Sequence, residues 1–531
     1  MLPETDVQKM RCYELVQRTN QLNLSGRRYE EQAFIEMISG EQSGRTLCIT
    51  CKDRFGSYGQ VGYLVLELYD RVLYVREFAM SCRVMGKCVE NALSAWLSSM
   101  AKKLDFDEIV LRGVKTDRNG LVVKTFSAIG FEDKAMFEDD IALSLSSNAV
   151  VAHADAVKIN DSVSQDMSQS SLQVISDSPT EVREAFVFIP HQDDEVLTCG
   201  AGIIELIRSL KGRVAVVLCT DGRNCETRAW LGDGESCPDL HDRHDYSFDK
   251  KTYGQLRDIE FIEACKALGV PESQIHFAYP RIEDGCLGTR DAEKIILDYV
   301  KWYPGSLVCT HFPIDNESEA VRIRADRLSE YALENEHFIE LPGGEKTWAR
   351  QHGDHYNLGR AALALLQEGR VGALELFVEF YHFEQFKERY PRVPVFEYAL
   401  FGKDARKLRA AIDAYGVWLP EEERYALGLH SARKELGSLR DRPVGFISVL
   451  NKNDIENKNY RARGQDRMIG LMQAEYTRAA CGNVLLQNRV DELERALADS
   501  ECGASELRTS TSYRVGKAIM ALPCALKDRM K

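Results

Sequence analysis

Residues 186–196 read FVFIPHQDDEV, and this stretch decides the fold of the central part of the chain. An apolar run ends at Pro190, and His191 and the three acids Asp193, Asp194 and Glu195 follow almost at once. Neighbouring carboxylates at the end of a buried strand repel one another unless a cation lies between them. The stretch therefore predicts a strand whose carboxyl end carries a functional site.

Apolar runs of the same kind follow at residues 213–219, 274–280 and 306–313. Stretches with apolar residues at helical spacing, each running into glycine, lie between them at 201–212 and 256–270. Strands that alternate with helices form a parallel α/β sheet. Because ligands bind beyond the carboxyl ends of parallel strands, we expect Asp221 and His311, which also follow apolar runs, to gather beside His191.

The composition excludes several classes of protein. The chain has 531 residues, too many for one core, with 44% hydrophobic and 28% charged residues, as in globular domains. Its net charge of −14 argues against nucleic acid as a partner. The absence of a membrane-length apolar run and of a secretory signal predicts a cytoplasmic protein. The 15 scattered cysteines, including the CITC motif at 48–51, predict reduced thiols rather than disulfides or a zinc site.

A serine-rich stretch at 160–180 predicts a linker, because it cannot bury enough apolar surface to fold alone. The expected division is an N-terminal domain (1–150), a linker (151–182), a central α/β domain (183–400), an unassigned extension (401–475) and a helical tail (476–531). Heptad-like spacing at 484–498 predicts a short coiled coil and, through it, an oligomer. The basic, amphipathic end at 513–531 predicts contact with a membrane surface or a partner, the alternative being a docked helix.

The acidic stretch is explained by a divalent metal. His191 and Asp194 combine imidazole with carboxylate, a ligand pair that suits Zn²⁺ or a similar ion. A catalytic zinc needs a third protein ligand and an open position. The later candidates are HGDH at 352–355, HDRH at 241–244 and His311. We favour His355, because an amphipathic helix begins beside it and gives the side chain a fixed position.

These motifs resemble those of the LmbE-like (PIG-L) N-acetylglucosaminyl deacetylase family over roughly residues 183–385. The family pattern is a strand followed by HPDDE, then a strand end with TDG, then HxDH at a helix start. The matching residues are His191, Asp193, Asp194 and Glu195; Thr220, Asp221 and Gly222; and His352, Asp354 and His355. Gln192 replaces the usual proline. About 40 residues separate THFP from HGDH, more than is usual in the family, which predicts a lid or a reshaped substrate pocket.

The resemblance implies a role for each matching residue. His191, Asp194 and His355 would hold Zn²⁺ or another divalent metal, and Asp193 would be the general base. His352 would stabilise the oxyanion and protonate the leaving amine. Arg257 and Asp284 are candidate substrate contacts. The alternative, a solvated helix start rich in acids, leaves His191 and HGDH unexplained.

The N-terminal domain has the order of elements of an acyl-thioester-binding fold. Two strands within 47–68 and a third ending near Met80 precede RVMGKCV (83–89), which opens an amphipathic helix. A turn of this kind presents backbone N–H groups to a pyrophosphate. The order matches the acetyltransferase (GNAT) fold, and residues 13–135 resemble the C-terminal acyltransferase-like domain of FkbH-type proteins. Four segments carry that resemblance: RTNQLNLSGRRY (18–29), KDRFGSYGQVG (52–62), MSCRVMGKCVE (80–90) and FSAIGF (126–131).

This second resemblance implies binding of acyl-CoA or of an acyl-phosphopantetheine on a carrier protein. The residues expected at the pyrophosphate turn are Arg83, Gly86, Lys87 and Cys88. Asn119 would bind the pantetheine arm, and Cys82 is an alternative nucleophile. The phosphatase-like half of FkbH-type proteins is absent, so loading of a glyceryl unit by that route is not expected.

The expected architecture is α/β: a GNAT-like mixed-sheet domain, a Rossmann-like parallel deacetylase domain and a helical C-terminal tail. Together the two domains predict a bifunctional enzyme that deacetylates a nucleotide- or lipid-linked N-acetylamino sugar and attaches a different acyl group. The tail loosely resembles ends of bacterial polysaccharide glycosyltransferases, which favours cell-surface glycan biosynthesis at the inner face of the membrane. Two alternatives stand beside this: a deacetylase whose N-terminal domain only docks an acyl carrier protein, and a non-catalytic assembly scaffold.

Overall fold

The computed structural model describes residues 3–450, except for short gaps and two longer ones. The gaps are 40–44, 153–156, 163–166, 168–172, 175–182, 226, 233–244, 315–337, 341–345, 349–350, 384–385, 388–392 and 394. These residues belong to one compact unit, residues 1–465, and the second unit, 466–531, lies outside the description. The predicted coiled coil and basic tail therefore lie outside the described residues. Within the described part, no helix combines the length and the apolar character needed to cross a membrane.

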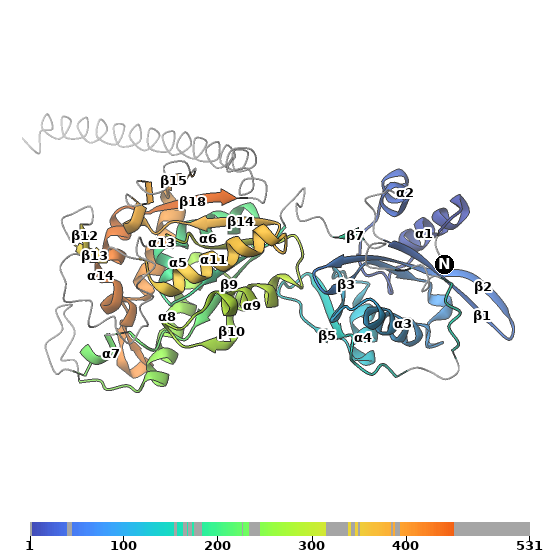
Figure 1. Cartoon of the computed structure of the whole chain (residues 1–531), viewed down its shortest axis with the longest axis horizontal. Helices are drawn as coiled ribbons and strands as arrows, with labels where there is room; N and C mark the ends of the chain where they lie inside the picture. The colour runs from blue at the N-terminus through green and yellow to red at the C-terminus, as the bar shows by residue number, and fades with distance from the viewer. Residues whose placement is uncertain are drawn as a thin grey trace, which may run out of the picture. The chain divides into compact units, whose positions relative to one another are not determined.

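The N-terminal part forms a mixed seven-stranded sheet, drawn in blue in Figure 1. Its order is β1-β2-β3-β4-β6-β5, with β7 added beside β2. The strands are β1 (Arg45–Asp53), β2 (Gly56–Tyr69), β3 (Val72–Met80), β4 (Glu108–Val114), β5 (Glu132–Asp133), β6 (Asp140–Ser146) and β7 (Gln173–Val174). The helices are α1 (Asp6–Arg18), α2 (Glu31–Ser39), α3 (Val89–Lys103) and α4 (Gly120–Ile129). This mixed sheet with its helices is the GNAT-like domain that the sequence predicts, and β7 shows that part of the predicted linker pairs with it.

Strands β3 and β4 diverge, and the chain itself fills the gap between them. They pair in parallel only from Val72 to Val75. Beyond that point residues 22–24 lie between the strands: Leu24 N–H donates to Phe78 C=O (2.8 Å), and Met80 N–H donates to Leu22 C=O (2.9 Å). On the other side, Val114 N–H donates to Leu24 C=O (3.3 Å). We call residues 22–24 the wedge; all three are buried.

The central part forms a second seven-stranded sheet of order β10-β9-β8-β11-β14-β18-β15. The strands are β8 (Ala185–Ile189), β9 (Val214–Thr220), β10 (Ile275–Ile282), β11 (Leu307–His311), β14 (Ala373–Phe377), β15 (Phe396–Ala399) and β18 (Val444–Leu450). The first five in the sheet order are parallel; β18 pairs antiparallel with β14, and β15 pairs antiparallel with β18. The four strands expected from the apolar runs are therefore neighbours in a parallel sheet, as predicted. All residues of β8 and β9 are buried, which explains their unbroken apolar character.

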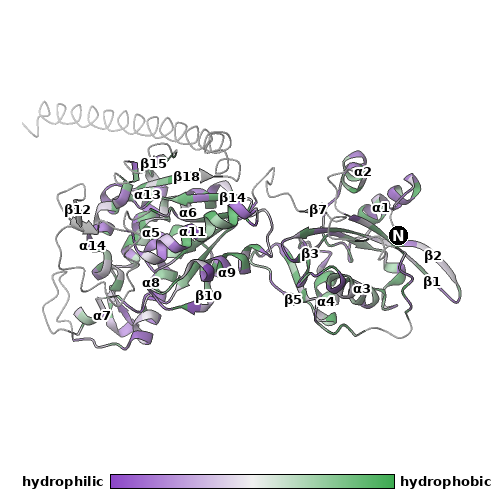
Figure 2. Cartoon of the chain, viewed as in Figure 1, coloured by the Kyte–Doolittle hydropathy of each residue, from purple (hydrophilic) through white to green (hydrophobic). Residues whose placement is uncertain are grey.

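Figure 2 shows hydrophobic and hydrophilic residues mixed along α11 and α13, and the amphipathic helix expected after HGDH is present as α11. The helices of this part are α5 (Asp194–Leu197), α6 (Gly200–Ser209), α7 (Thr227–Trp230), α8 (Lys250–Leu268), α9 (Thr289–Val300), α11 (Gly353–Glu368), α13 (Gly402–Ala414) and α14 (Leu427–Asp441). The extension that the sequence left unassigned is thus not separate, because α13 packs against α8 and β18 pairs with β14. The sheet runs on to Leu450, well past the expected boundary at 400.

The two sheets contact each other within the compact unit. Arg112 of β4 pairs with Glu184 just before β8 (2.6 Å), and Arg213 pairs with Asp140 of β6 (2.8 Å). The backbone N–H of Met136 donates to the Tyr303 hydroxyl (2.6 Å). These contacts join the two sheets directly, so their connection does not depend on residues 151–182 alone.

Candidate metal centre and active site

The candidate site lies at the carboxyl end of the parallel strands. His191 follows β8, Asp221 follows β9, Asp284 follows β10, and His311 ends β11. Glu379 follows β14 in the same way. All five are buried or nearly so. The polar residues at the strand ends therefore lie at one edge of the sheet, as the sequence predicted, and Glu379 is a further member of this group.

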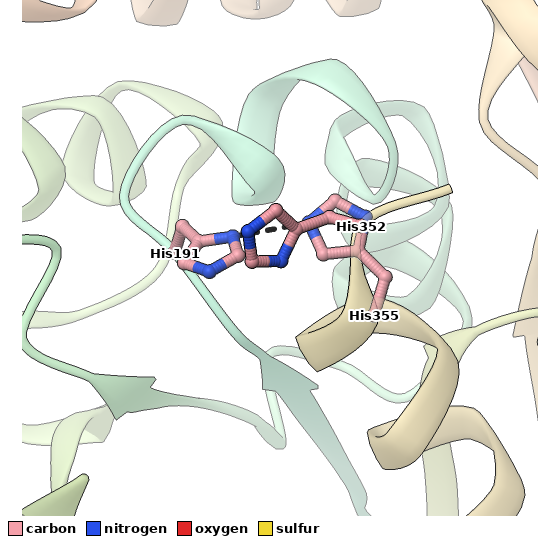
Figure 3. A group of neighbouring side chains, drawn as sticks. All are labelled: His191, His352 and His355. Carbon is pink, nitrogen blue, oxygen red and sulfur yellow. Dashed lines mark hydrogen bonds between the residues drawn. The ribbon is translucent and has the colours of Figure 1, made fainter. Parts of the chain in front are cut away.

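The three predicted metal ligands lie close together, and Figure 3 shows two of them, His191 and His355, beside His352. His191 Nδ1 lies 3.1 Å from His355 Nε2, and His355 Nε2 lies 3.1 Å from Asp194 Oδ2. His191 Nδ1 lies 3.4 Å from the same carboxylate oxygen. Ligand atoms of a tetrahedral site with bonds of about 2.0–2.1 Å are separated by about 3.3 Å. The three donor atoms therefore have the mutual spacing that a tetrahedral divalent ion requires.

His311 is a further nitrogen donor beside this group. Its Nε2 lies 3.3 Å from Asp194 Oδ1, and its ring centroid lies 4.3 Å from that of His355. The side chain is fully buried, and neither ring nitrogen has a hydrogen-bond partner among the described residues. Asp194, His311 and His355 together form another group whose ligand atoms could hold one ion. His311 therefore lies against Asp194 at the edge of the ligand group.

Carboxylates fix the orientation and the charge of the ligand histidines. His355 Nδ1 lies 2.5 Å from Glu379 Oε1, which directs its Nε2 toward Asp194. Burial lowers the pKa of His355, but Asp194 and Glu379 outweigh this effect and raise the pKa to about 10. The pKa of His191 is likewise raised, against the effect of burial, by Asp284 and by Asp194. The neighbouring carboxylates thus favour protonation of both rings, and a bound cation would compete with those protons for the ring nitrogens.

Asp193 is placed beside the ligands without being one of the three. Its carboxylate Oδ2 accepts from Arg257 Nη2 (2.7 Å), while the same guanidinium also bonds the Gln192 carbonyl. Burial raises the pKa of Asp193 to about 6, although Arg257 acts to lower it. Arg257 was expected as a substrate contact at a loop or helix start. The structure instead places it inside α8, 3% exposed and bonded to Asp193.

His352 is the N-cap of α11, and its ring lies against that of His191, with centroids 4.6 Å apart. Its Nδ1 accepts the backbone N–H of Asp354 (3.2 Å), so the neutral ring carries its proton on Nε2. Burial lowers the pKa of His352 to about 4, and His191 contributes to this effect. His352 is therefore a neutral hydrogen-bond donor rather than a proton store at neutral pH.

The remaining motif residues support this arrangement. Asp354 accepts the backbone N–H groups of Gly285 (2.8 Å) and Leu287 (3.0 Å), which ties α11 to the loop after β10. Asp284 lies 3.1 Å from His191 Nε2, so it faces a ligand and is 9% exposed. Gln192, which stands in place of the usual proline, donates to Asp258 (2.8 Å).

Sequence reasoning missed two residues that contact the motif. Glu379 could have been found, because it follows an apolar run, ALELFV at 373–378, as His191 follows its own. Tyr415 gave no such signal. Its hydroxyl accepts the backbone N–H of Asp193 (2.8 Å) and donates to Glu195 Oε1 (2.5 Å). The predicted alternative ligands in HDRH, at 241–244, and most of the segment from 315 to 350 lie outside the described residues.

The residues predicted at the pyrophosphate turn do lie at the start of α3. Cys88 is its N-cap in a left-handed conformation (φ 58°), and Gly86 also has positive φ (72°). The four residues predicted at this turn are all exposed: Arg83, Gly86, Lys87 and Cys88. Lys87 Nζ lies 3.5 Å from Asp53 Oδ2. Cys82 is exposed in the preceding short helical turn. The turn is thus accessible, and its binding of a thioester cofactor stays a prediction.

Asn119 is placed differently from the other residues predicted for the cofactor. It is 1% exposed, and its amide nitrogen donates to Asn23 C=O (3.0 Å) and Val114 C=O (2.8 Å). Its amide oxygen accepts from Thr116 N–H (2.8 Å). The side chain therefore holds the wedge against β4, and contact with a pantetheine arm would have to be made in addition to these bonds.

Comparisons with known proteins agree with this division of the chain. Residues 186–366 match the family described as PIG-L, GlcNAc-PI de-N-acetylase. A deacetylase of teicoplanin biosynthesis is similar at 16% identity over 51% of this chain and 99% of its own, with a TM-score of 0.30. The N,N'-diacetylchitobiose deacetylase of Pyrococcus horikoshii is similar at 15% identity over 52% of this chain and 86% of its own, with a TM-score of 0.29.

The N-terminal part has structural neighbours of another kind. The ribosomal-protein-S18-alanine N-acetyltransferase of Escherichia coli is similar at 12% identity over 29% of this chain and 96% of its own, with a TM-score of 0.21. No curated protein sequence matches the chain at a significant level. The family match thus covers the parallel strands β8 to β11 and the HGDH helix start of the central part, and the mixed sheet of the N-terminal part lies before it in the sequence.

Proposed function

We propose that this chain is a metal-dependent N-deacetylase of an N-acetylamino sugar, and that its N-terminal domain acylates the amine so released. One observation carries the first half. The donor atoms of His191, Asp194 and His355 converge at 3.1–3.4 Å from one another, with the carboxylate of Asp193 held beside them. A general base next to a three-ligand site with an open position is the arrangement of metal-assisted amide hydrolysis.

The proposed ion is Zn²⁺ or another divalent metal held by His191, Asp194 and His355. The mixed nitrogen and oxygen donors and their spacing fit such an ion. When bound, it would polarise the amide carbonyl and lower the pKa of water. Glu379 orients the imidazole of His355, and Asp284 orients that of His191.

Asp193 is proposed to take the proton of the attacking water. A base works best when its pKa lies near the working pH, and burial raises the pKa of Asp193 to about 6. Arg257 holds one carboxylate oxygen, which leaves the other to accept the proton. Water adds its oxygen to the acetyl carbonyl, the C–N bond breaks, and Asp193 returns the proton to the leaving nitrogen. The products are acetate and the free amine.

His352 is proposed to stabilise the oxyanion. Because its Nδ1 accepts a backbone N–H, its Nε2–H is the free donor, and the ring faces His191. A neutral donor of this kind can hydrogen-bond the carbonyl oxygen as it becomes negative. Protonation of the amine by His352, the second role implied by resemblance, is less favoured because burial lowers the pKa of His352 to about 4.

The acyl-transfer half rests on the accessible turn at the start of α3. Exposed Arg83 and Lys87 and the free backbone N–H groups of the helix start would receive the pyrophosphate of CoA or the phosphate of a carrier-bound phosphopantetheine. The amine would attack the thioester carbonyl, giving an amide and a free thiol. A cell-surface glycan precursor, linked to a nucleotide or a lipid, is the proposed acceptor. The reaction would take place at the cytoplasmic face of a membrane, with the basic tail as the contact.

One observation favours a second candidate function. The wedge occupies the backbone of β3 that faces β4, through Phe78 and Met80. An extended ligand could not pair with these strand edges while the wedge is present. This favours a deacetylase whose N-terminal domain docks an acyl carrier protein without transferring its cargo. The three ligands and the base, which are all in place, argue against a non-catalytic scaffold.

The test is a panel of N-acetylamino sugars and their nucleotide conjugates, with acetate release measured before and after treatment with a chelator. We expect release that stops with the chelator, returns with Zn²⁺ and is absent in Asp194→Asn. Release that persists without metal, or in that variant, would refute the metal-dependent hydrolase. Addition of acyl-CoA then separates the two candidates, because only a transferase gives an N-acyl sugar that is lost in Lys87→Ala.

A further inference from the structure

Tyr415 connects the extension to the deacetylase motif. It caps the C-terminal end of α13, 49 positions beyond the last residue of the family match at 366, and its side chain is fully buried. The hydroxyl accepts the backbone N–H of Asp193 (2.8 Å) and donates to Glu195 Oε1 (2.5 Å). One hydroxyl group thus bonds both acids that flank the ligand Asp194.

The backbone that Tyr415 bonds has an uncommon conformation. Asp193 has φ 95° and ψ −27°, outside the regions that non-glycine residues usually occupy. Such a conformation persists only where surrounding groups hold it, and it is found mainly at functional sites. Here Glu195 Oε2 also accepts the Asp193 N–H (3.0 Å), and Arg257 bonds the preceding carbonyl and the carboxylate. Tyr415 supplies the contact that comes from outside the motif and outside α8.

The ring and the hydroxyl of Tyr415 do different things. The ring packs against Gly428, where an added Cβ would lie 2.0 Å from the ring. The backbone carbonyl of Tyr415 accepts from Leu429 N–H (3.2 Å). Ring packing and this backbone bond join α13 to α14 and would survive replacement by phenylalanine. The hydroxyl bonds only the motif among the described residues, so it has no part in that packing.

We propose that the Tyr415 hydroxyl is a positioning group: it orients the base Asp193 and the metal ligand Asp194 toward the same site. Asp193 and Asp194 are consecutive, so the peptide that Tyr415 fixes sets the direction of both carboxylates. This inference rests on the proposed deacetylase function. It also makes residues 402–447 part of the catalytic domain, a role that the family match does not contain.

The extension is anchored well enough to serve this purpose. Glu260 of α8 accepts the backbone N–H groups of Leu427 (2.7 Å) and Gly428 (2.9 Å) at the start of α14. Helix α13, which carries Tyr415, packs on the same α8, the helix that also carries Arg257. Arg257 and Tyr415, which both bond Asp193 from outside the motif, are therefore both held in place by α8.

The test compares Tyr415→Phe with Tyr303→Phe in the full chain. Tyr303 is the matched control, because its buried hydroxyl also accepts a backbone N–H, that of Met136 (2.6 Å), away from the site. With saturating Zn²⁺, we expect kcat of Tyr415→Phe to fall about 10- to 100-fold with KM changed less than about twofold, the effect of a displaced catalytic group. Its Zn²⁺ Kd should rise about tenfold, as when an outer partner of a ligand is lost. The control should keep kcat and Kd within about twofold at a similar melting temperature.

Two results would overturn the proposal. The first is a Tyr415→Phe variant whose kcat and Zn²⁺ Kd both stay within twofold of wild type. The second is a control that loses as much kcat as Tyr415→Phe. If wild type releases no acetate from any substrate of the panel, the proposed function fails by itself. The Zn²⁺ Kd, measured by competition with a chromophoric chelator, then decides the positioning role alone, with an unchanged value refuting it.

Discussion

Glu379 offers a sharp test of the metal centre, because its carboxylate holds a ligand rather than the ion. It is 1% exposed, and its Oε1 lies 2.5 Å from His355 Nδ1 and 3.1 Å from Gln351 Nε2. Its second oxygen bonds His382. Replacement by glutamine keeps the shape and removes the charge, so His355 Nδ1–H is left with a neutral acceptor.

The size of the effect follows from these contacts. A hydrogen bond to a charged group contributes about 1.5–3 kcal/mol, against about 1 kcal/mol for a neutral one. The difference, about 0.5–2 kcal/mol, corresponds to about 2- to 30-fold in affinity. Because the site is buried, no bulk water replaces the lost charge. Glu379→Gln should therefore raise the Zn²⁺ Kd about tenfold, within the range known for partners of ligand histidines. Glu379→Ala, which leaves the nitrogen without an acceptor, should raise it about 100-fold.

The assay removes metal with a chelator and titrates Zn²⁺ back against a chromophoric competitor. Glu375→Gln is the matched control, because Glu375 lies four residues earlier, in β14, is equally buried and receives the same substitution. It should leave the Kd within about twofold. The reasoning is refuted by a Glu379→Gln variant with wild-type affinity, or by a Glu375→Gln variant that loses as much.

Three further predictions follow from the same contacts. Metal binding at pH 7 should release about two protons, because both ligand histidines have raised pKa values; calorimetry showing no dependence on buffer ionisation would contradict this. Arg257→Gln should raise the pKa of Asp193 above about 6 and move the acid limb of kcat/KM to higher pH, since the cation acts to lower it; an unmoved limb would exclude Asp193 as the base. Gly113→Ala, whose Cβ would lie 1.8 Å from Leu24 O, should cost about 1–3 kcal/mol in urea unfolding, whereas Gly120→Ala, with open space, should be neutral.

The sequence predicted the parallel sheet and the ligand set because both depend on local patterns. Unbroken apolar runs identify buried strands, and a parallel sheet places all their carboxyl ends at one edge. His191 and His355 are 164 positions apart, yet each follows a recognisable boundary, one at a strand end and one at a helix start. Their meeting could therefore be expected before the distances were known.

Sequence reasoning failed where function depends on a contact without a local pattern. Tyr415 ends an ordinary amphipathic helix, and nothing around it indicates a partner 222 positions earlier. Arg257 was expected near the start of a helix as a substrate contact, whereas α8 begins seven residues earlier, at Lys250, and Arg257 bonds Asp193. The bonds of the buried Asn119 amide to the wedge were not foreseen either, and its contact with a pantetheine arm stays a prediction. In each case the partner, and not the residue type, decides the role.

The three neighbouring acids can stand in one helical turn because each has a different partner. Asp193 pairs with Arg257, 64 positions away. Asp194 lies among the histidines. Glu195 bonds Tyr415, and burial raises its pKa well above the usual value, which weakens its charge repulsion with the neighbouring acids. Since Glu379 and Tyr415 both lie beyond residue 366, the motif within the family match cannot separate these charges alone. On the proposed function, the catalytic unit therefore extends through α13, and β18, which pairs with β14, belongs to the same sheet.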